Sequence, residues 1–259
     1  MNERRVVLGV ASGGAPTTPF LEGLAKMKLP NNVAPLRRSF AFGNFVPAQR
    51  ELIMNDAVDD MFDYLFFVDD DIVLPEHALE MLVATAEADP STAVVGGLYY
   101  SRDSARPVTV AGWNSSDTSS AHIPAFTSTS TGIVDGVGFG CALLRVSAAK
   151  TLTAPYFSAH VYIERSARLA RVCDEDYLYC ERVRQAGYVV RLDARVRCLH
   201  YDRSSNTSAP IAWERDDVTS VPRMIVADKG VVNLVPLDPS TPRIVERHVP
   251  VDLSYITVD

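Results

Sequence analysis

The sequence contains a five-residue apolar run that ends abruptly in three acidic residues. Residues 64–68 read Tyr-Leu-Phe-Phe-Val, and Asp69, Asp70 and Asp71 follow directly. A continuous apolar run of this length is typical of a central parallel strand that is covered on both faces. Because ligands of open parallel sheets bind beyond the carboxyl ends of the strands, the three carboxylates are predicted to lie at a binding site.

The acidic run places three like charges in adjacent positions, which is unfavourable unless solvent or a cation relieves the repulsion. Carboxylates suit hard divalent cations, and Mg²⁺ or Mn²⁺ commonly bridges a carboxylate and a diphosphate. An isolated acidic run would most often be a solvated turn. Its position directly after a buried strand instead favours a metal-binding site.

The residues around this motif alternate between strand and helix patterns. Residues 6–10 and 93–98 read as strands, and residues 46–62 carry apolar side chains at helical spacing. Pro75 is predicted to open a further helix, because proline is tolerated in the first turn. This alternation predicts an α/β fold in which a mostly parallel, doubly wound sheet is flanked by helices.

The second half of the chain is predicted to extend the same sheet. Strands are expected over residues 141–146 and 188–192, and a helix over residues 176–186 that ends at Gly187. Residues 101–132 are rich in Ser, Thr and Asp and are expected to form a mobile or surface insertion, with residues 108–113 as a candidate strand.

Composition limits the classes of protein that the chain can belong to. With 47% hydrophobic residues the chain can bury a sizeable core, and no apolar run approaches the length of a membrane-spanning helix. The first apolar run is too short for a signal peptide, so a cytoplasmic protein is expected. The net charge of −7 weighs against nucleic acid as a tightly held partner, although not as an acceptor.

Two further positions could carry chemistry. Glu175 and Asp176 stand at the start of a predicted helix, where acidic residues can simply complement the helix dipole. If one of these carboxylates projects into a cleft, it could act as a general base. His200 follows a predicted strand, and such a histidine is more often structural, although neutral imidazole is a competent metal ligand.

In this order, the three motifs resemble those of GT-A fold glycosyltransferases of the family-two type. In that family a DxD motif ends a strand of the nucleotide-binding half, an ED motif opens a later helix, and a histidine further on often completes the metal site. Residues 69–71 match the first motif, residues 175–176 the second and His200 the third. The resemblance covers roughly residues 5–202.

The resemblance implies roles for the donor-side residues. Asp71 would bind Mn²⁺ or Mg²⁺ directly, and Asp69 would support the metal or contact the ribose. His200 would be a further metal ligand. Asp70 is counted with its neighbours among the nucleotide-sugar-binding residues.

The resemblance also implies nucleotide contacts and a catalytic carboxylate. Ala11 and Ser12, at the end of the first strand, would approach the base, and Arg50 would contact the nucleotide. Asp176 would deprotonate the acceptor hydroxyl in an inverting enzyme, with Glu175 as its rival. In a retaining enzyme the same carboxylate would only position the substrate.

A glycine-rich segment before the strand at residues 141–146 resembles the acceptor-side loop of the family. It contains Gly136, Gly138 and Gly140. The same glycines could instead serve only to make a tight turn, and both interpretations stay open.

These implications predict a division of the chain. Residues 1–204 would form a GT-A catalytic domain, with a nucleotide-sugar-binding half at 1–100 and an acceptor-side half at 101–204. Residues 205–259, where prolines multiply, would form an irregular or β-rich C-terminal extension.

The predicted activity is that of a metal-dependent hexosyltransferase that moves a sugar from a nucleotide-diphosphate sugar to an acceptor hydroxyl. UDP is the favoured donor nucleotide and GDP the next. The acceptor stays open among a glycan, a protein, a small metabolite and a modified nucleic-acid base, and the oligomeric state stays open too. The QxxRW motif of processive synthases is missing, which favours addition of a single sugar.

Two alternatives compete with this prediction. A sugar-phosphate nucleotidyltransferase would share a similar sheet, but it would carry a basic residue close behind its first glycine-rich loop, and none is present. A non-catalytic carbohydrate- or protein-binding module could retain a decayed transferase fold. The intact set of acidic residues and histidine argues against that alternative.

Overall fold

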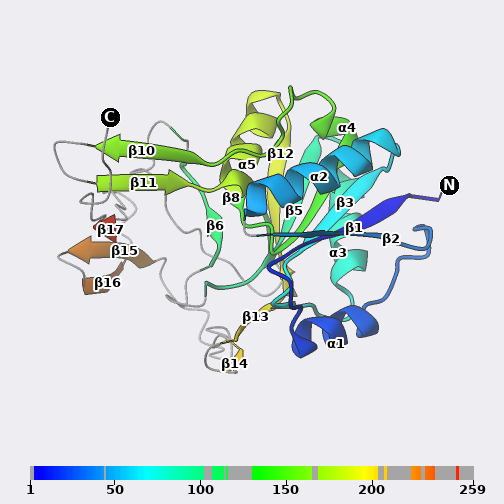
Figure 1. Cartoon of the computed structure of the whole chain (residues 1–259), viewed down its shortest axis with the longest axis horizontal. Coiled ribbons are helices and arrows are strands. Elements are labelled where there is room, and N and C mark those ends of the chain that lie inside the picture. The colour runs from blue at the N-terminus through cyan, green and yellow to red at the C-terminus, as the bar shows by residue number, and fades with distance from the viewer. Residues whose placement is uncertain are drawn as a thin grey trace.

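The computed structural model describes residues 3–43, 45–101, 107–113, 115, 130–164, 169–203, 207–208, 223–228, 231–236 and 249–250. Seven strands form the central sheet, in the order β2-β1-β3-β9-β5-β12-β7 (Figure 1). They are β1 (Val6–Ser12), β2 (Arg37–Phe42), β3 (Tyr64–Val68), β5 (Thr92–Leu98), β7 (Thr131–Val134), β9 (Cys141–Arg145) and β12 (Val189–Arg197). The helices are α1 (Thr18–Lys26), α2 (Val46–Asp59), α3 (Ala78–Ala88), α4 (Val146–Ala149) and α5 (Glu175–Gln185).

The sheet is mixed but mostly parallel. β1 pairs in parallel with both β2 and β3, and β5 pairs in parallel with β12. β9 runs antiparallel between β3 and β5, and β7 runs antiparallel along the outer side of β12. The predicted mixed, mostly parallel sheet flanked by helices is therefore confirmed.

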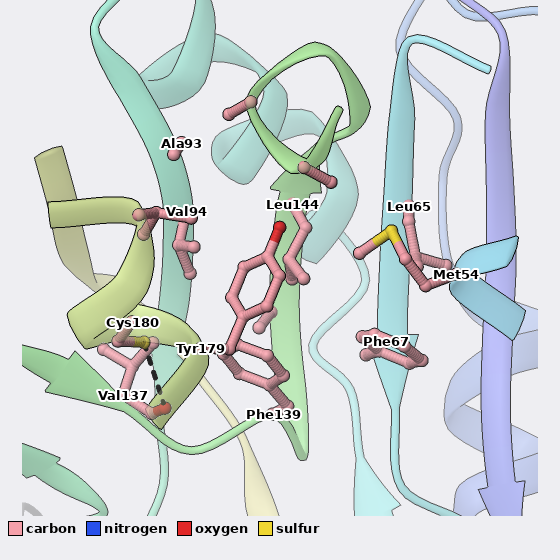
Figure 2. Close-up of a cluster of buried hydrophobic side chains, with 14 of the residues drawn as sticks. Met54, Leu65, Phe67, Ala93, Val94, Val137, Phe139, Leu144, Tyr179 and Cys180 are labelled. Atoms are coloured by element: carbon pink, nitrogen blue, oxygen red, sulfur yellow. Dashed lines mark hydrogen bonds between the residues drawn. The ribbon is translucent and has the colours of Figure 1, made fainter. Parts of the chain in front are cut away.

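Successive side chains of each strand point to opposite faces of the sheet, so each face has its own hydrophobic core. Leu65 and Phe67 pack with residues of α2, α4 and α5, whereas Phe66 and Val68 pack with residues of α1 and α3. Figure 2 shows the first core, to which Tyr179 of α5 contributes. Full burial of each large apolar side chain stabilises the fold by about 1.5–3 kcal/mol, so β3 gives the acidic run a rigid support.

Most elements of the first half lie where the sequence predicts them. The strands predicted at residues 6–10, 64–68 and 93–98 are β1, β3 and β5. The helix predicted from residue 46 is α2. The helix predicted to open at Pro75 begins only at Ala78. Pro75 lies in the turn before the helix, and its carbonyl oxygen accepts a hydrogen bond from the backbone N–H of Ala78.

The second half matches its prediction in place but not in every direction. The strand predicted at residues 141–146 is β9, and its antiparallel direction was not predicted. α5 is followed by Gly187, whose φ of +90° fits the predicted glycine at the helix end. β12 continues to Arg197, five residues beyond the predicted end at residue 192. Its pairing with β7 ends at Asp193, whereas its pairing with β5 resumes at Arg197, opposite Leu98.

Part of the predicted surface insertion belongs to the ordered fold. β6 (Thr109–Val110) pairs with β8 (Gly136–Val137), and Thr109 and Trp113 are buried. Residues 131–132 begin β7 at the sheet edge. Of residues 101–132, the structure describes residues 101, 107–113, 115 and 130–132, and the others lie outside the described residues.

Small sheets surround the main one. β4 (Ile72–Val73) pairs with β13 (Leu199–Asp202), which also pairs with β14 (Thr207–Ser208). β10 (His160–Glu164), β11 (Leu169–Cys173) and β17 (Val249–Pro250) form a second small sheet, and β15 (Arg223–Asp228) forms a hairpin with β16 (Val231–Pro236). The described residues beyond residue 205 are strands, while the irregular or β-rich character predicted for residues 205–259 and the domain boundary stay predictions. None of the helices in the described part of the chain is both long and apolar enough to cross a membrane.

Candidate active site

The acidic run forms a tight turn between β3 and β4. The backbone N–H of Asp69 donates to the carbonyl oxygen of Gly140 at 3.1 Å, and the N–H of Ile72 donates to the carbonyl oxygen of Asp69 at 3.0 Å. These bonds hold the turn at the carboxyl end of β3, beside the carboxyl end of β1. The three carboxylates nevertheless have different partners, so they do not all bind one common group.

Asp71 faces His200. The N–H of Tyr201 donates to the carbonyl oxygen of Asp71 at 2.8 Å, and this bond brings β13 to the acidic turn. Nε2 of His200 lies 3.5 Å from Oδ1 of Asp71, and Nδ1 lies 3.0 Å from the carbonyl oxygen of Tyr100. A carbonyl oxygen can only accept, so Nδ1 carries a proton. In the neutral imidazole the lone pair of Nε2 then faces Asp71.

Asp70 is occupied by two protein groups. Its Oδ2 accepts a hydrogen bond from Oγ of Ser12 at 2.5 Å, and its Oδ1 accepts one from Nη2 of Arg203 at 2.6 Å. Its carbonyl oxygen accepts from the backbone N–H and the hydroxyl of Thr17, which caps α1. Asp70 therefore ties β1, α1 and the chain after β13 to the acidic turn.

Asp69 is paired with Arg50 of α2, whose Nη2 lies 2.9 Å from its Oδ1. Nη1 of Arg50 donates to Glu175 of α5 and lies 4.0 Å from Oδ2 of Asp176. Arg50 thus joins the DxD motif to the ED motif, although more than a hundred residues separate the two in the sequence.

The guanidinium of Arg50 is enclosed. Its side chain is 4% exposed and lies against the rings of Phe67 and Phe139, at 5.7 and 5.5 Å from their centroids. Burial lowers the pKa of Arg50, but the charges of Asp69 and Glu175 outweigh burial and raise it above the ordinary value. Arg50 is therefore a permanent buried cation, and its bonds are to carboxylates of the protein.

Asp176 lies beside this ion-pair network and carries a perturbed carboxyl group. Burial, followed by the charge of Glu175, raises its pKa to about 8, and Arg50 only partly offsets this. The backbone N–H groups of Tyr177 and Phe139 donate to its two oxygens at 2.7 and 3.3 Å. A carboxyl group that titrates near neutral pH in a buried position is suited to proton transfer.

The predicted acceptor-side glycines are buried at positions where side chains of neighbouring elements approach the backbone closely. A Cβ on Gly136 would lie 2.5 Å from Cδ1 of Tyr177, and one on Gly140 would lie 2.9 Å from Cζ of Tyr99. A Cβ on Gly138 would clash with the Tyr99 hydroxyl, which accepts a hydrogen bond from the N–H of Gly140 at 3.0 Å. Close packing thus accounts for all three glycines, and a role in acceptor binding stays a prediction.

The remaining predicted residues stand at the end of β1. Ala11 and Ser12 are 7% and 1% exposed. Oγ of Ser12 is engaged with Asp70 and with the N–H of Gly14. Any contact of this strand end with a nucleotide base would therefore be made through the backbone.

The residues predicted as metal ligands are only partly assembled. No three His, Cys, Asp or Glu side chains lie close enough to hold a metal ion among the residues that the structure describes. Asp71 and His200 present an oxygen and a nitrogen to each other, while Asp69 faces Arg50. A carboxylate and a neutral imidazole fit Mn²⁺, with phosphate oxygens and water as its other ligands.

Arg203, Tyr99 and Tyr100 belong to the site but were not predicted. Tyr99 contacts the ring of His200 edge-on, with centroids 5.8 Å apart, and Tyr100 fixes the orientation of that ring. No spacing rule singles these residues out. The one available signal was proximity in the sequence, since Arg203 lies three residues after His200.

Comparisons with known proteins agree with the fold. Residues 28–153 match the sequence profile of Glycosyl transferase family 2. No curated protein sequence gives a significant match. Among solved structures, A197 from STIV aligns with a TM-score of 0.56 at 16% identity, over 79% of this chain and 93% of that one. GalNAc-T7 with UDP, GalNAc and Mn²⁺ aligns with a TM-score of 0.54 at 9% identity, over 78% of this chain and 44% of that one.

Proposed function

We propose that this chain, which carries a family-two glycosyltransferase domain on a GT-A fold, transfers a sugar from a nucleotide-diphosphate donor to an acceptor hydroxyl in a metal-dependent reaction. The observation that carries the proposal is the convergence of the DxD motif, the ED motif and His200. They come from β3, α5 and β13 and meet at the carboxyl end of the sheet. Ligands of open α/β sheets bind at this end.

On the donor side, Asp71 and His200 would hold Mn²⁺ or Mg²⁺. When bound, such an ion neutralises the diphosphate and stabilises it as a leaving group. The carbonyl oxygen of Tyr100 accepts a hydrogen bond from Nδ1 of His200, which orients the ring so that Nε2 is the nitrogen that would face the ion. Asp69 is paired with Arg50, so it would support the donor site through this ion pair rather than as a free metal ligand.

On the acceptor side, Asp176 rather than Glu175 would be the general base. Glu175 accepts a hydrogen bond from the buried guanidinium of Arg50, so its carboxylate is engaged in that ion pair. Asp176 lies 4.0 Å from that guanidinium, and its pKa is raised to about 8. A base of this pKa matches the transfer of a hydroxyl proton near neutral pH. Direct displacement assisted by this base would invert the anomeric configuration.

The finer specificity is also part of the proposal. UDP is the favoured nucleotide and Mn²⁺ the favoured ion, because GalNAc-T7, which shares the fold, was crystallised with both. A hexose is the proposed sugar, and a single sugar is added. The acceptor class stays open, and a cytoplasmic location stays a prediction from the sequence.

Titration of UDP and of GDP into the protein tests the proposal directly. We expect one of the two to bind in the presence of Mn²⁺ and to lose most of its affinity in the presence of a chelator. Isothermal calorimetry measures both, and circular dichroism confirms that the protein is folded. Binding of neither nucleotide to folded protein would count against a transferase and favour the non-catalytic module.

The proposed metal ligand His200 gives a second expected result. His200→Ala should weaken Mn²⁺ binding by about tenfold to a hundredfold, as losses around a metal site do. Titration followed by electron paramagnetic resonance of free Mn²⁺ measures this. His77→Ala is a matched control, because His77 is exposed and pairs with Glu80 on α3. Equal Mn²⁺ affinity in both variants would remove His200 from the metal site.

A further inference from the structure

Two arginines contact the acidic turn, and their surroundings differ. Arg50 is 4% exposed and its side chain lies between carboxylates and two aromatic rings. Arg203 is 39% exposed and lies 2.6 Å from Oδ1 of Asp70 through Nη2. A guanidinium carries five N–H donors in a planar fork, and the bond to Asp70 uses only one of them. Arg203 therefore can reach a ligand at the carboxyl end of the sheet, whereas Arg50 is enclosed.

The place of Arg203 in the chain brings it to the donor side. β13 is fixed to the acidic turn by the bond between Tyr201 and Asp71 and by the pairing of His200 with Ile72. Arg203 follows β13 directly, and its guanidinium reaches Asp70, the residue that precedes the proposed metal ligand Asp71 in the acidic turn. A diphosphate held by an ion at Asp71 would therefore bind one residue along the turn from the position of this guanidinium.

Asp70 has the environment of an anchor. One oxygen accepts from Ser12 and the other accepts from Arg203, and the side chain is 10% exposed. A carboxylate with both oxygens engaged is poorly placed to bind an ion, and it orients whichever groups bind it. Asp70, the middle residue of the acidic run, therefore has a role that differs from that of Asp71.

We infer that Arg203 binds the diphosphate of the donor and that Asp70 is a positioning residue that holds the Arg203 guanidinium beside it. The chemistry is that of a planar guanidinium and phosphate oxygens, which form charge-assisted and often paired hydrogen bonds. The inference rests on the proposed function, because it takes the donor to be a nucleoside-diphosphate sugar. It assigns a second cation to the leaving group and leaves Arg50 as an internal partner of the carboxylates.

The test compares nucleoside diphosphates with the corresponding monophosphates. UDP, GDP, CDP, ADP and TDP are titrated in the presence of Mn²⁺, and the tightest binder is paired with its monophosphate. Arg203→Ala should weaken binding of the diphosphate about tenfold to a hundredfold, the size expected for lost hydrogen bonds between charged groups. The affinity for the monophosphate should change by less than about threefold, since the monophosphate lacks the phosphate that Arg203 contacts. Arg203→Lys should recover part of the loss, because it keeps the charge without the fork.

Asp70→Asn tests the positioning role through a double-mutant cycle. Asparagine can still accept the Ser12 hydroxyl but loses the ion pair, so diphosphate affinity should fall about threefold to tenfold. The Asp70→Asn/Arg203→Ala double variant should bind no more weakly than Arg203→Ala alone, because Asp70 acts through the arginine. Arg4→Ala is the matched control for a lost surface arginine. Arg4 is 37% exposed and pairs with Glu87 at 2.8 Å, next to the start of β1, so it should leave both affinities unchanged.

The outcomes separate the inference from the proposed function. If wild-type protein binds a diphosphate with Mn²⁺ but Arg203→Ala keeps the same preference over the monophosphate, the inference is wrong and the proposed function stands. If the effects of the two substitutions add, Asp70 does not act through Arg203, and its positioning role is wrong. If folded wild-type protein binds none of the five diphosphates, the proposed function falls, and the inference falls with it.

Discussion

Arg50→Met should lower the free energy of unfolding by about 3–5 kcal/mol, the usual loss when one partner of a buried ion pair is removed. Methionine fills much of the same volume, so the loss comes from charge rather than from a cavity. Asp69 and Glu175 would lose the guanidinium that both contact, and their carboxylates would be left without this counter-charge. Chemical denaturation at pH 7 measures the change.

The pH dependence of this loss identifies its cause. The uncompensated carboxylates can take up protons in acid, which removes their charge. The difference in stability between Arg50→Met and wild-type protein should therefore shrink as the pH falls from 7 to 5. A loss caused by poor packing of methionine would be the same at both pH values.

Two further variants sharpen the result. Arg50→Lys keeps the charge but cannot bond Asp69 and Glu175 with the same planar fork, so it should recover only part of the stability. Arg4→Met removes an arginine from a partly exposed pair with Glu87 and should cost less than about 1 kcal/mol. If Arg50→Met were as stable as Arg4→Met, the network around Arg50 would be of no importance to the fold.

Local patterns were enough to predict the elements that form the donor side of the site. β3 could be recognised because a buried parallel strand is apolar throughout, and its end could be recognised because three acidic residues follow the apolar run. α2 could be recognised because apolar residues recur at helical spacing, although only some of them, such as Ile53 and Ala57, are buried, and Leu52 is exposed. β2 was missed, since its pattern of burial is irregular: Ala41 is its one buried residue, and Phe40 and Phe42 are exposed at the edge of the sheet.

Long-range pairing could not be predicted from these local patterns. The antiparallel direction of β9 depends on its insertion between β3 and β5, which no local pattern encodes. Arg50 was predicted as a nucleotide contact because of its place in the sequence. Its bonds to Asp69 and Glu175 arise only when α2 and α5 pack on the same face of the sheet. The order of the motifs predicted which residues converge, but not which of them neutralise one another.

Asp176→Asn should reduce the rate of sugar transfer by about a hundredfold to ten-thousandfold, the usual contribution of a general base. The amide keeps the size of the side chain but cannot take up the acceptor proton. Binding of the donor nucleotide with Mn²⁺ should change little, because Asp176 contacts Arg50 and the backbone of Phe139 and Tyr177, whereas the proposed metal ligands Asp71 and His200 pair with each other. A coupled assay for nucleotide release measures the rate, and calorimetry measures the binding.

The control for this variant is its neighbour. Glu175→Gln removes a partner of Arg50 rather than the base, so transfer should retain a rate that rises with pH. The rise should lie at a lower pH than in wild-type protein, because the charge of Glu175 no longer raises the pKa of Asp176. Asp176→Asn should lose this rise. Normal transfer by Asp176→Asn would show that the base lies elsewhere, and loss of the rise in Glu175→Gln alone would assign the role to Glu175.

Stability gives an independent measure of the state of Asp176. Its pKa in the fold, about 8, lies above the ordinary value of 3.8, so the folded protein holds a proton that the unfolded chain releases between these values. Wild-type stability from this group is therefore fully present at acid pH and is lost as the pH rises toward 8. Asp176→Asn carries no such group, so its stability relative to wild type should increase from pH 5 to pH 9. A parallel pH dependence of the two proteins would mean that Asp176 is already ionised in the fold, and a base that is ionised at every working pH would give transfer no rise near pH 8.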